Sequence, residues 1–111
     1  MNKVILMGRL TRDPDIRSAN VNVARFTLAV DRRKKEENAD FISCVAFGKT
    51  ADFVGNYLHQ GTKICLEGRI QTSTYNKQDG TKGYSTDVIV ESVEFAESKK
   101  KDDFSDGTLP F

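Results

Sequence analysis

Hydrophobic residues recur at every second position through much of the chain, a pattern typical of β-strands. Residues 4–10 are apolar on both alternating faces, which predicts a strand covered on both sides. Residues 25–30 carry large apolar side chains on one face and smaller or polar ones on the other, so this strand has one buried side. Residues 41–47 predict a third strand, after a charged loop over residues 31–40.

The interval between Gly48 and Gly61 predicts the one helix of the chain. Apolar residues recur there at the spacing of a single helical stripe. Thr50 is a candidate N-terminal cap, and Gly61 suits a left-handed C-terminal end. The members of the stripe are Phe53, Val54, Tyr57 and Leu58.

A long hairpin arm follows the helix. Residues 63–74 and 83–96 predict two strands, and residues 75–82 join them through Asp79-Gly80, a strong turn signal. Tyr75 is expected where this arm leaves the body of the domain. Gly68 interrupts the first of the two strands, where a barrel needs a bend or a bulge.

Three strands, one helix and two strands, in that order, predict an all-β fold: a five-stranded Greek-key barrel of the oligonucleotide-binding type (OB-fold). The short helix lies between strands three and four, and the arm joins strands four and five. The predicted domain covers residues 1–97, and residues 98–111, where the hydrophobic pattern stops, predict a disordered tail. The predicted core consists of the helix stripe and Val4, Leu6, Phe26, Leu28, Val30, Ile64, Leu66, Val88 and Val90.

Length and composition narrow the class of protein. The 111 residues, 38% hydrophobic and 30% charged, suit one domain. No apolar run approaches the roughly 20 residues of a membrane-spanning helix, and the start of the chain lacks a signal-peptide core, so we expect a cytoplasmic protein with no membrane partner. Cys44 and Cys65 have no disulfide or zinc spacing and are expected to be reduced core thiols.

The net charge of +1 conceals a segregation of charge along the chain. Residues 1–35 hold nine Lys or Arg against three Asp or Glu, whereas residues 36–98 hold five against ten. Bulk charge therefore does not indicate a polyanionic partner. Any binding of nucleic acid must depend on a local basic face that the fold builds.

The sequence predicts no active site. The one histidine, His59, is expected to be a surface residue near the end of the helix. Hydroxyl residues lack a nearby base, and there is no phosphate-binding glycine loop and no metal-ligand spacing. We therefore expect a protein that is not an enzyme and needs no cofactor or metal.

The aromatic residues are more informative. Phe41 and Phe47 are six positions apart in one strand, so both rings stand on one face, and the small apolar residues of the opposite face suit a narrow barrel interior. Two outward rings indicate either stacking on bases or packing under a loop or subunit. Tyr75 favours stacking, although it could also pack against its own hairpin.

Basic residues lie in the loops and at the strand ends near these rings. Alternating rings and cations bind single strands without reading sequence, because every base has a flat face and phosphates follow a basic groove. Each basic run taken alone is usually a solvated loop. The candidate phosphate-binding residues are Arg32, Arg33, Lys34, Lys35, Lys49, Lys77 and Lys82.

Several stretches of the chain follow a known pattern: residues 2–14, 26–30, 45–51 and 67–72, Tyr57-Leu58 before Gly61, and the final Leu109-Pro110-Phe111. On these stretches the chain resembles the bacterial-type single-stranded DNA-binding proteins over essentially its whole length. The resemblance implies an OB-fold homotetramer that coats single-stranded DNA during replication, recombination and repair. It also implies base stacking for Phe41, Phe47 and Tyr75, and a basic contact for Lys49.

The loop after the second strand departs from the family pattern. The family often has a further stacking aromatic there, whereas this chain has the basic run 32–35. We therefore expect phosphate contacts from that loop, in place of stacking.

The tail is similar to the acidic tip with which the family recruits replication and repair proteins. Its apolar anchor would be Leu109, Pro110 and Phe111 beside the acidic Asp106, and the alternative is a frayed terminus without a partner. The linker before it is short, as would suit a protein encoded by a phage or mobile element.

Ile5 and Met7 suggest an oligomer. Both are apolar on the face of the first strand opposite Val4 and Leu6, and a barrel needs only one of those faces, so a subunit interface would cover the other. Three functions remain open from the residues themselves: a coat for single-stranded DNA, a barrel that binds single-stranded RNA or a structured nucleic acid, and a protein–protein adaptor.

Overall fold

A computed structural model of the chain describes residues 1–33 and 38–97. Strands dominate it, with one helix between the fourth and fifth strands. The elements are β1 (Val4–Leu10), β2 (Asp15–Arg17), β3 (Val23–Val30), β4 (Asp40–Phe47), α1 (Gly48–Tyr57), β5 (Lys63–Asn76) and β6 (Lys82–Phe95).

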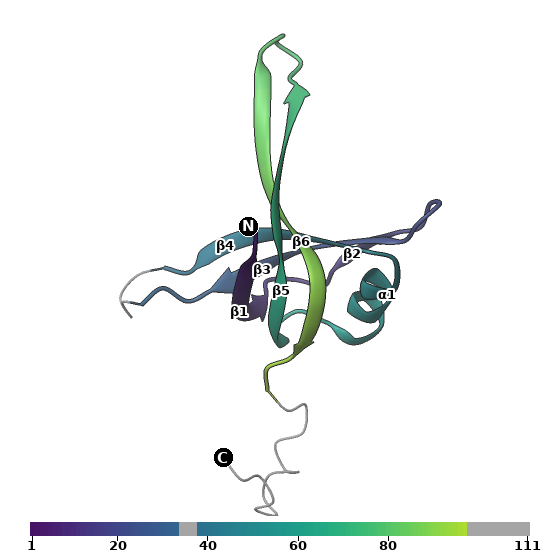
Figure 1. Cartoon of the computed structure of the whole chain (residues 1–111), viewed down its shortest axis with the longest axis vertical. Coiled ribbons are helices and arrows are strands. Elements are labelled where there is room, and N and C mark those ends of the chain that lie inside the picture. Colours follow the sequence, from purple (N-terminus) through teal and green to yellow (C-terminus); the bar gives the residue numbers. More distant parts are fainter. Residues whose placement is uncertain (34–37, 98–111) are drawn as a thin grey trace, which may run out of the picture.

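Five of the six strands close into a ring. The sheet runs β1-β5-β6-β4-β3, and β1 returns to pair with β3 through Arg9 opposite Ala29 and Leu10 opposite Leu28. The pairing of β4 with β6 is parallel, and the other pairings are antiparallel. This is the predicted five-stranded OB-fold barrel, with α1 beside it and the arm rising from it along the long axis of the molecule (Figure 1).

The sequence did not predict β2. Its three residues are all exposed, so they carry no alternation of buried and polar positions. Backbone pairing to β3 forms the strand instead, with Asp15 opposite Arg25 and Arg17 opposite Val23. Since β2 lies outside the ring, the barrel itself keeps five strands.

The core occupies the inside of the ring and agrees with the prediction. Six of the predicted strand residues are buried: Phe26, Leu28, Ile64, Leu66, Val88 and Val90. Val4, Leu6 and Val30 are partly buried and pack against them. Burying an aliphatic or phenyl side chain contributes about 1.5–3 kcal/mol, so each of the six buried residues stabilises the ring by about that amount.

The predicted caps of α1 were wrong. The helix ends at Tyr57, and the extended residue Leu58 follows it. Gly61 does have a positive φ of 88°, but it belongs to the next turn, where its N–H donates to the Leu10 carbonyl at 2.8 Å. Thr50 does not cap the other end, because the capping position is Phe47 and has no side-chain hydrogen bond.

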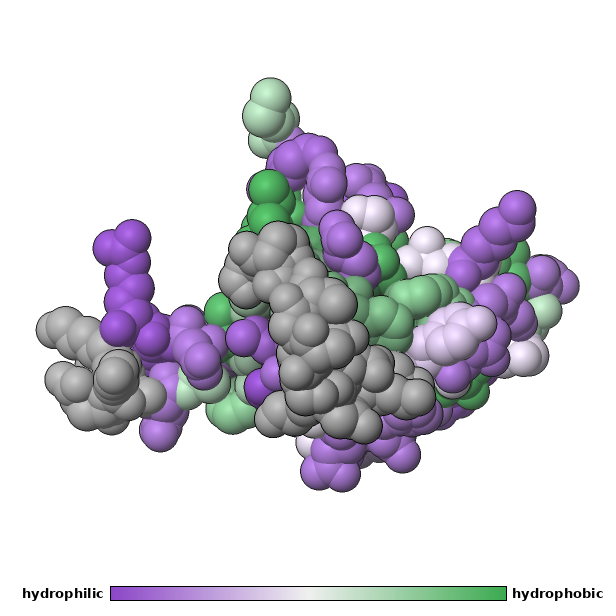
Figure 2. Space-filling model, turned by 90° about the horizontal axis from the view of Figure 1, so that it is seen from below, coloured by the Kyte–Doolittle hydropathy of each residue, from purple (hydrophilic) through white to green (hydrophobic). Residues whose placement is uncertain are grey.

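The buried side of α1 differs from the predicted stripe, because Ala51 is buried without having been predicted and Leu58 lies just after the helix. Val54 and Leu58 are buried and Phe53 packs partly against the core, as predicted, whereas Tyr57 is exposed. The Phe53 ring lies between those of Tyr57 and Phe95, with centroid distances of 5.1 and 5.7 Å. Seen from the end opposite the arm, hydrophobic side chains show between hydrophilic ones (Figure 2).

The arm is the outer part of the β5–β6 hairpin. Its first strand runs to Asn76 and is longer than predicted, whereas its second runs from Lys82 to Phe95 and is shifted by one residue from the prediction. The predicted turn is confirmed: Gly80 has a φ of 91°, and Asp79 accepts hydrogen bonds from the Thr81 backbone and hydroxyl at 3.0 and 2.7 Å. These bonds to Thr81 hold the pKa of the Asp79 carboxyl below its usual value.

The two cysteines occupy opposite sides of the barrel wall. Cys44 is buried in the core, as predicted, whereas Cys65 is only half-buried and alternates with the buried Ile64 and Leu66. Cys65 therefore faces outward, opposite Met7 on β1, and the prediction that both thiols are in the core was wrong for this one. Burial, with a smaller contribution from Asp87, raises the pKa of the Cys44 thiol to about 12.

A thiol reagent should therefore distinguish the two cysteines. Near pH 8 we expect Cys44 to react only after unfolding, because it is shielded and keeps its proton. Cys65 should react without unfolding, and most readily when no second subunit covers the outer face of β1 and β5. Counting labels by mass spectrometry, with Cys65→Ser as the control that should show none in the native state, tests this. Native labelling of the Cys65→Ser variant would contradict the prediction.

The free energy of unfolding should also depend on the Cys44 thiol. The unfolded chain loses the Cys44 proton at a lower pH than the folded chain, so the free energy of unfolding should fall as pH rises from about 9 toward about 12.

Candidate nucleic-acid interface

The two phenylalanines of β4 stand on the outside of the barrel. Phe41 is 65% exposed and Phe47 46% exposed. The residues of the opposite register point inward as predicted, with Cys44 and Ala46 fully buried and Ile42 packed against the core. Two large rings with this exposure are free to contact a ligand.

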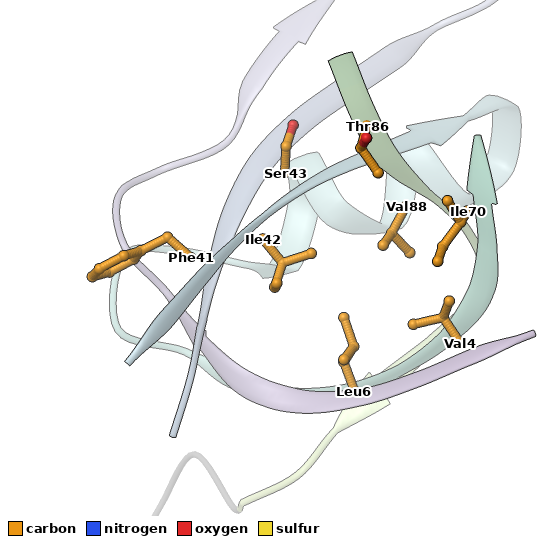
Figure 3. A pocket seen from close by; sticks show the side chains of 8 residues that line it. All are labelled: Val4, Leu6, Phe41, Ile42, Ser43, Ile70, Thr86 and Val88. Carbon is orange, nitrogen blue, oxygen red and sulfur yellow. The ribbon is translucent and has the colours of Figure 1, made fainter. Parts of the chain in front are cut away.

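At the open end of the barrel, inward-pointing apolar side chains can be distinguished from the outward-pointing Phe41 ring. Val4, Leu6, Ile42, Ile70 and Val88 point toward one another, whereas the Phe41 ring points away from them (Figure 3). These side chains and their neighbours line a hollow of about 330 Å³. Phe41 therefore lies at the rim of the barrel, outside its apolar interior.

A stretch without aromatic rings separates Phe41 from Phe47. Six residues at about 3.3 Å each place them about 20 Å apart. Ser43 and Val45 lie between them on the same face of β4, opposite Thr27 and Arg25 of β3. Ser43 is exposed, and its hydroxyl donates to Asp87 at 2.7 Å, whereas Val45 is buried despite facing outward.

Tyr75 is not where the sequence predicted it. It pairs with Gly83, one position from the end of β5, so it lies near the tip of the arm and not where the arm leaves the barrel. Its ring lies across Gly83, since a Cβ there would come within 2.6 Å of ring atoms. The ring thus packs on its own hairpin while remaining half exposed.

Tyr84 is an exposed ring that the sequence analysis overlooked. It pairs with Thr74, the neighbour of Tyr75, and therefore occupies the opposite face of the arm. It is 75% exposed, the highest exposure of any ring among the described residues. Its position in an alternating strand next to the turn was the available signal.

The predicted basic residues fall into three places. Lys49 is exposed in the first turn of α1, two residues after Phe47, while Lys77 and Lys82 are exposed at the tip of the arm near Tyr75. Arg33 is exposed, and Arg32 forms an ion pair with Asp40 at 2.8 Å, next to Phe41. Lys34 and Lys35 lie outside the described residues, as do Asp106, Leu109, Pro110 and Phe111.

Other basic residues divide into paired and unpaired groups. Lys3 pairs with Glu67, Arg9 with Glu97 and Arg69 with Glu91. Arg12 and Arg25, by contrast, form no ion pair with any described carboxylate, and both line a hollow on the outside of β3 and β4. The sequence analysis did not select these two arginines, although Arg25 shares its face with Phe41 and Phe47.

Residues 1–33 and 38–97 contain neither of two further kinds of site. No group of three or more His, Cys, Asp or Glu side chains there is arranged to hold a metal ion. Within the same ranges, no helix has the length and apolar character needed to cross a membrane.

Comparison with known proteins points to one family. Residues 1–96 match the model of the Single-strand binding protein family. A single-stranded DNA-binding protein of Clostridium perfringens is 52% identical over 101 residues, covering 88% of this chain and 67% of that protein. A single-stranded DNA-binding protein of Bacillus cereus is 50% identical over 105 residues, which cover 89% of this chain and 62% of that protein. One of Clostridium acetobutylicum is 44% identical over 120 residues, which cover 96% of this chain and 83% of that protein. The chain thus spans about two thirds of the length of two of these relatives.

Proposed function

The chain belongs to the single-strand binding protein family, and from this premise we propose that it binds single-stranded DNA without sequence preference, as a coat and not as an enzyme. The observation that carries the proposal is the pair Phe41 and Phe47, exposed on one face of β4. Aromatic rings offer stacking platforms to any base, and cations beside them attract the backbone. Exposed Lys49 lies two residues after Phe47, in the first turn of α1.

The arm and the loop after β3 extend this surface in our proposal. Tyr75 with Lys77 and Lys82 would supply a ring and two cations at the tip of the arm, and the run 32–35 would contact phosphates beyond Phe41. Within that run, the ion pair of Arg32 with Asp40 supports a smaller contribution from Arg32 than from its neighbours. Residues 1–97 would form the DNA-binding domain.

A titration with oligonucleotides tests the proposed function. Tyrosine emission of the protein is followed as unlabelled oligo(dT), the matched oligo(U) or a duplex of equal length is added. We expect tight binding of oligo(dT) and much weaker binding of the duplex, whose bases are not free to stack. Preference for oligo(U) would indicate an RNA-binding barrel, and no binding of any of the three would overturn the proposal in favour of an adaptor.

We further propose that the chain acts in the cytoplasm, in DNA replication, recombination and repair, and that Leu109, Pro110 and Phe111 with Asp106 recruit enzymes of these processes. Two apolar side chains beside a proline can insert into a pocket on a partner, and a nearby acidic group can meet basic residues at its rim. The support for this role is the sequence of the segment and its resemblance to the tips of the family.

A homotetramer is the assembly that we propose. Its support is an exposed apolar surface on the outer face of β1 and β5: Ile5 is 69% exposed, Met7 is 52% exposed, and Cys65 lies opposite Met7. Contiguous apolar residues on the outside of a barrel indicate an interface between subunits.

Replacing both residues with Ile5→Asp and Met7→Asp should reduce the sedimenting mass from about four times 12.4 kDa toward that of one chain. Charges placed in an apolar interface lose hydration without gaining partners, so association becomes unfavourable. Val21→Asp, at an exposed apolar position in the segment before β3, is the control and should leave the mass unchanged. A wild-type monomer at micromolar concentration would contradict the tetramer.

A further inference from the structure

The outside of β3 and β4 carries a hollow that none of the proposed contacts uses. It has a volume of about 310 Å³ and lies where β3 pairs with both β2 and β4. Arg12 and Arg25 line it together with Thr27 and Ser43. The two guanidinium groups and the Thr27 hydroxyl are donors of the kind that bind a phosphate, whereas the Ser43 hydroxyl already donates to Asp87.

The fold holds both arginines in place. Arg25 is on β3, paired with Asp15 on one side and Val45 on the other. Arg12 follows Thr11, whose backbone N–H donates to the Thr27 carbonyl at 3.0 Å and so ties the segment after β1 to β3. The two side chains therefore approach the same hollow from neighbouring segments.

The carboxylates of the hollow have partners elsewhere. Asp13 accepts the backbone N–H of Gln60 at 2.8 Å, and Asp15 lies 3.6 Å from the guanidinium of Arg17. Neither forms an ion pair with Arg12 or Arg25 within the described part of the chain. Both guanidinium groups thus retain their capacity to bind an anion.

The position of the hollow suggests which anion it binds. Arg25 lies opposite Val45, on the face that carries Phe41 and Phe47 and between the two rings along β4. Rings about 20 Å apart are several nucleotides apart, since stacked nucleotides repeat every 3.4 Å or so. A strand that stacks on both rings therefore needs its backbone held in between.

We propose that Arg12 and Arg25 together bind the phosphodiester backbone of single-stranded DNA as it passes from Phe47 to Phe41. This assignment rests on the proposed function and adds a contact pair to it. A guanidinium pair fits two successive phosphates or two oxygens of one phosphate, and the Thr27 hydroxyl can donate a further hydrogen bond.

The salt dependence of oligo(dT) binding tests the assignment in the full-length protein. Each phosphate contact adds about 0.7 to the slope of log affinity against log salt concentration for a single strand. The double variant Arg12→Gln, Arg25→Gln should therefore lose about 0.7 from the magnitude of that slope if the pair holds one phosphate, or about 1.4 if it holds two, and bind more weakly at low salt. The double variant Arg12→Lys, Arg25→Lys should retain the wild-type slope.

The matched control is the double variant Arg9→Gln, Arg69→Gln, which makes the same change in net charge at arginines paired with Glu97 and Glu91. We expect its slope to equal that of the wild type. Equal losses in the test and control variants would overturn the assignment in favour of a general charge effect, and an unchanged slope in the test variant would overturn it outright. A wild-type protein that does not bind oligo(dT) would instead refute the proposed function, so the two failures are distinguishable.

Discussion

Replacing both Phe41 and Phe47 with alanine should weaken the binding of single-stranded DNA by about 2–6 kcal/mol, since stacking of one base on one ring is worth about 1–3 kcal/mol. Each single variant should lose about 5- to 150-fold in affinity. The rings are about 20 Å apart along β4, beyond the roughly 10 Å within which substitutions usually couple. We therefore expect the two losses in free energy to add.

The measurement is a titration of each variant with oligo(dT) at one fixed salt concentration. Loss of stability should not confound it, because neither ring belongs to the hydrophobic core of the barrel. Tyr57→Ala removes an exposed ring from α1, where the Tyr57 ring contacts Phe53, and is the control that should bind like the wild type. Affinities that are equal in the wild type and the double variant would exclude stacking at these residues and would leave them as candidates for a subunit contact.

The orientation of these rings was predictable because the alternation along β4 is strong. Ile42, Cys44 and Ala46 are small and apolar, which suits the inside of a narrow barrel and forces Phe41 and Phe47 to the outside. The same reasoning placed the core residues of β3, β5 and β6 correctly. A period of two needs only local sequence to be recognised.

Features that depend on contacts distant in sequence were not predictable in the same way. β2 exists because its backbone pairs with β3, and nothing in three exposed residues indicates that pairing. Arg12 and Arg25 share a hollow only after β1, β3 and β4 have come together. Tyr75 was misplaced for a related reason, since its distance from the barrel depends on how far the β5–β6 pairing continues.

Gly68 was predictable from local sequence, but its structural role depends on contacts between distant parts of the chain. The sequence predicted a bend or bulge there, and the register of β5 against β6 shifts at this point: Glu67 pairs with Ser92 and Gly68 with Val90, so Glu91 is the extra residue. A Cβ on Gly68 would lie 3.0 Å from the Ile89 carbonyl carbon and closer still to its oxygen. The obstacle is backbone in the wall of the barrel, which no change of rotamer can move aside.

Gly68→Ala should therefore destabilise the protein by about 3 kcal/mol or more, at or above the upper end of the usual cost of overpacking. For a domain of this size, that loss lowers the melting temperature by about 12 °C or more. Thermal and urea unfolding followed by circular dichroism measure both quantities. Since typical domains are stable by only about 5–15 kcal/mol, a variant that does not fold at all would also agree with the prediction.

Gly55→Ala is the matched control for this substitution. A Cβ on Gly55 would lie 3.2 Å from Cδ1 of Ile16, the flexible end of an exposed side chain that can move aside. Because Gly55 lies within α1, alanine should also raise the helix propensity and stabilise the protein by up to about 1 kcal/mol. Opposite signs for the two variants would assign the cost to the close approach of β5 and β6 at the bulge, whereas equal stabilities would show that the barrel can shift its backbone to admit a methyl group.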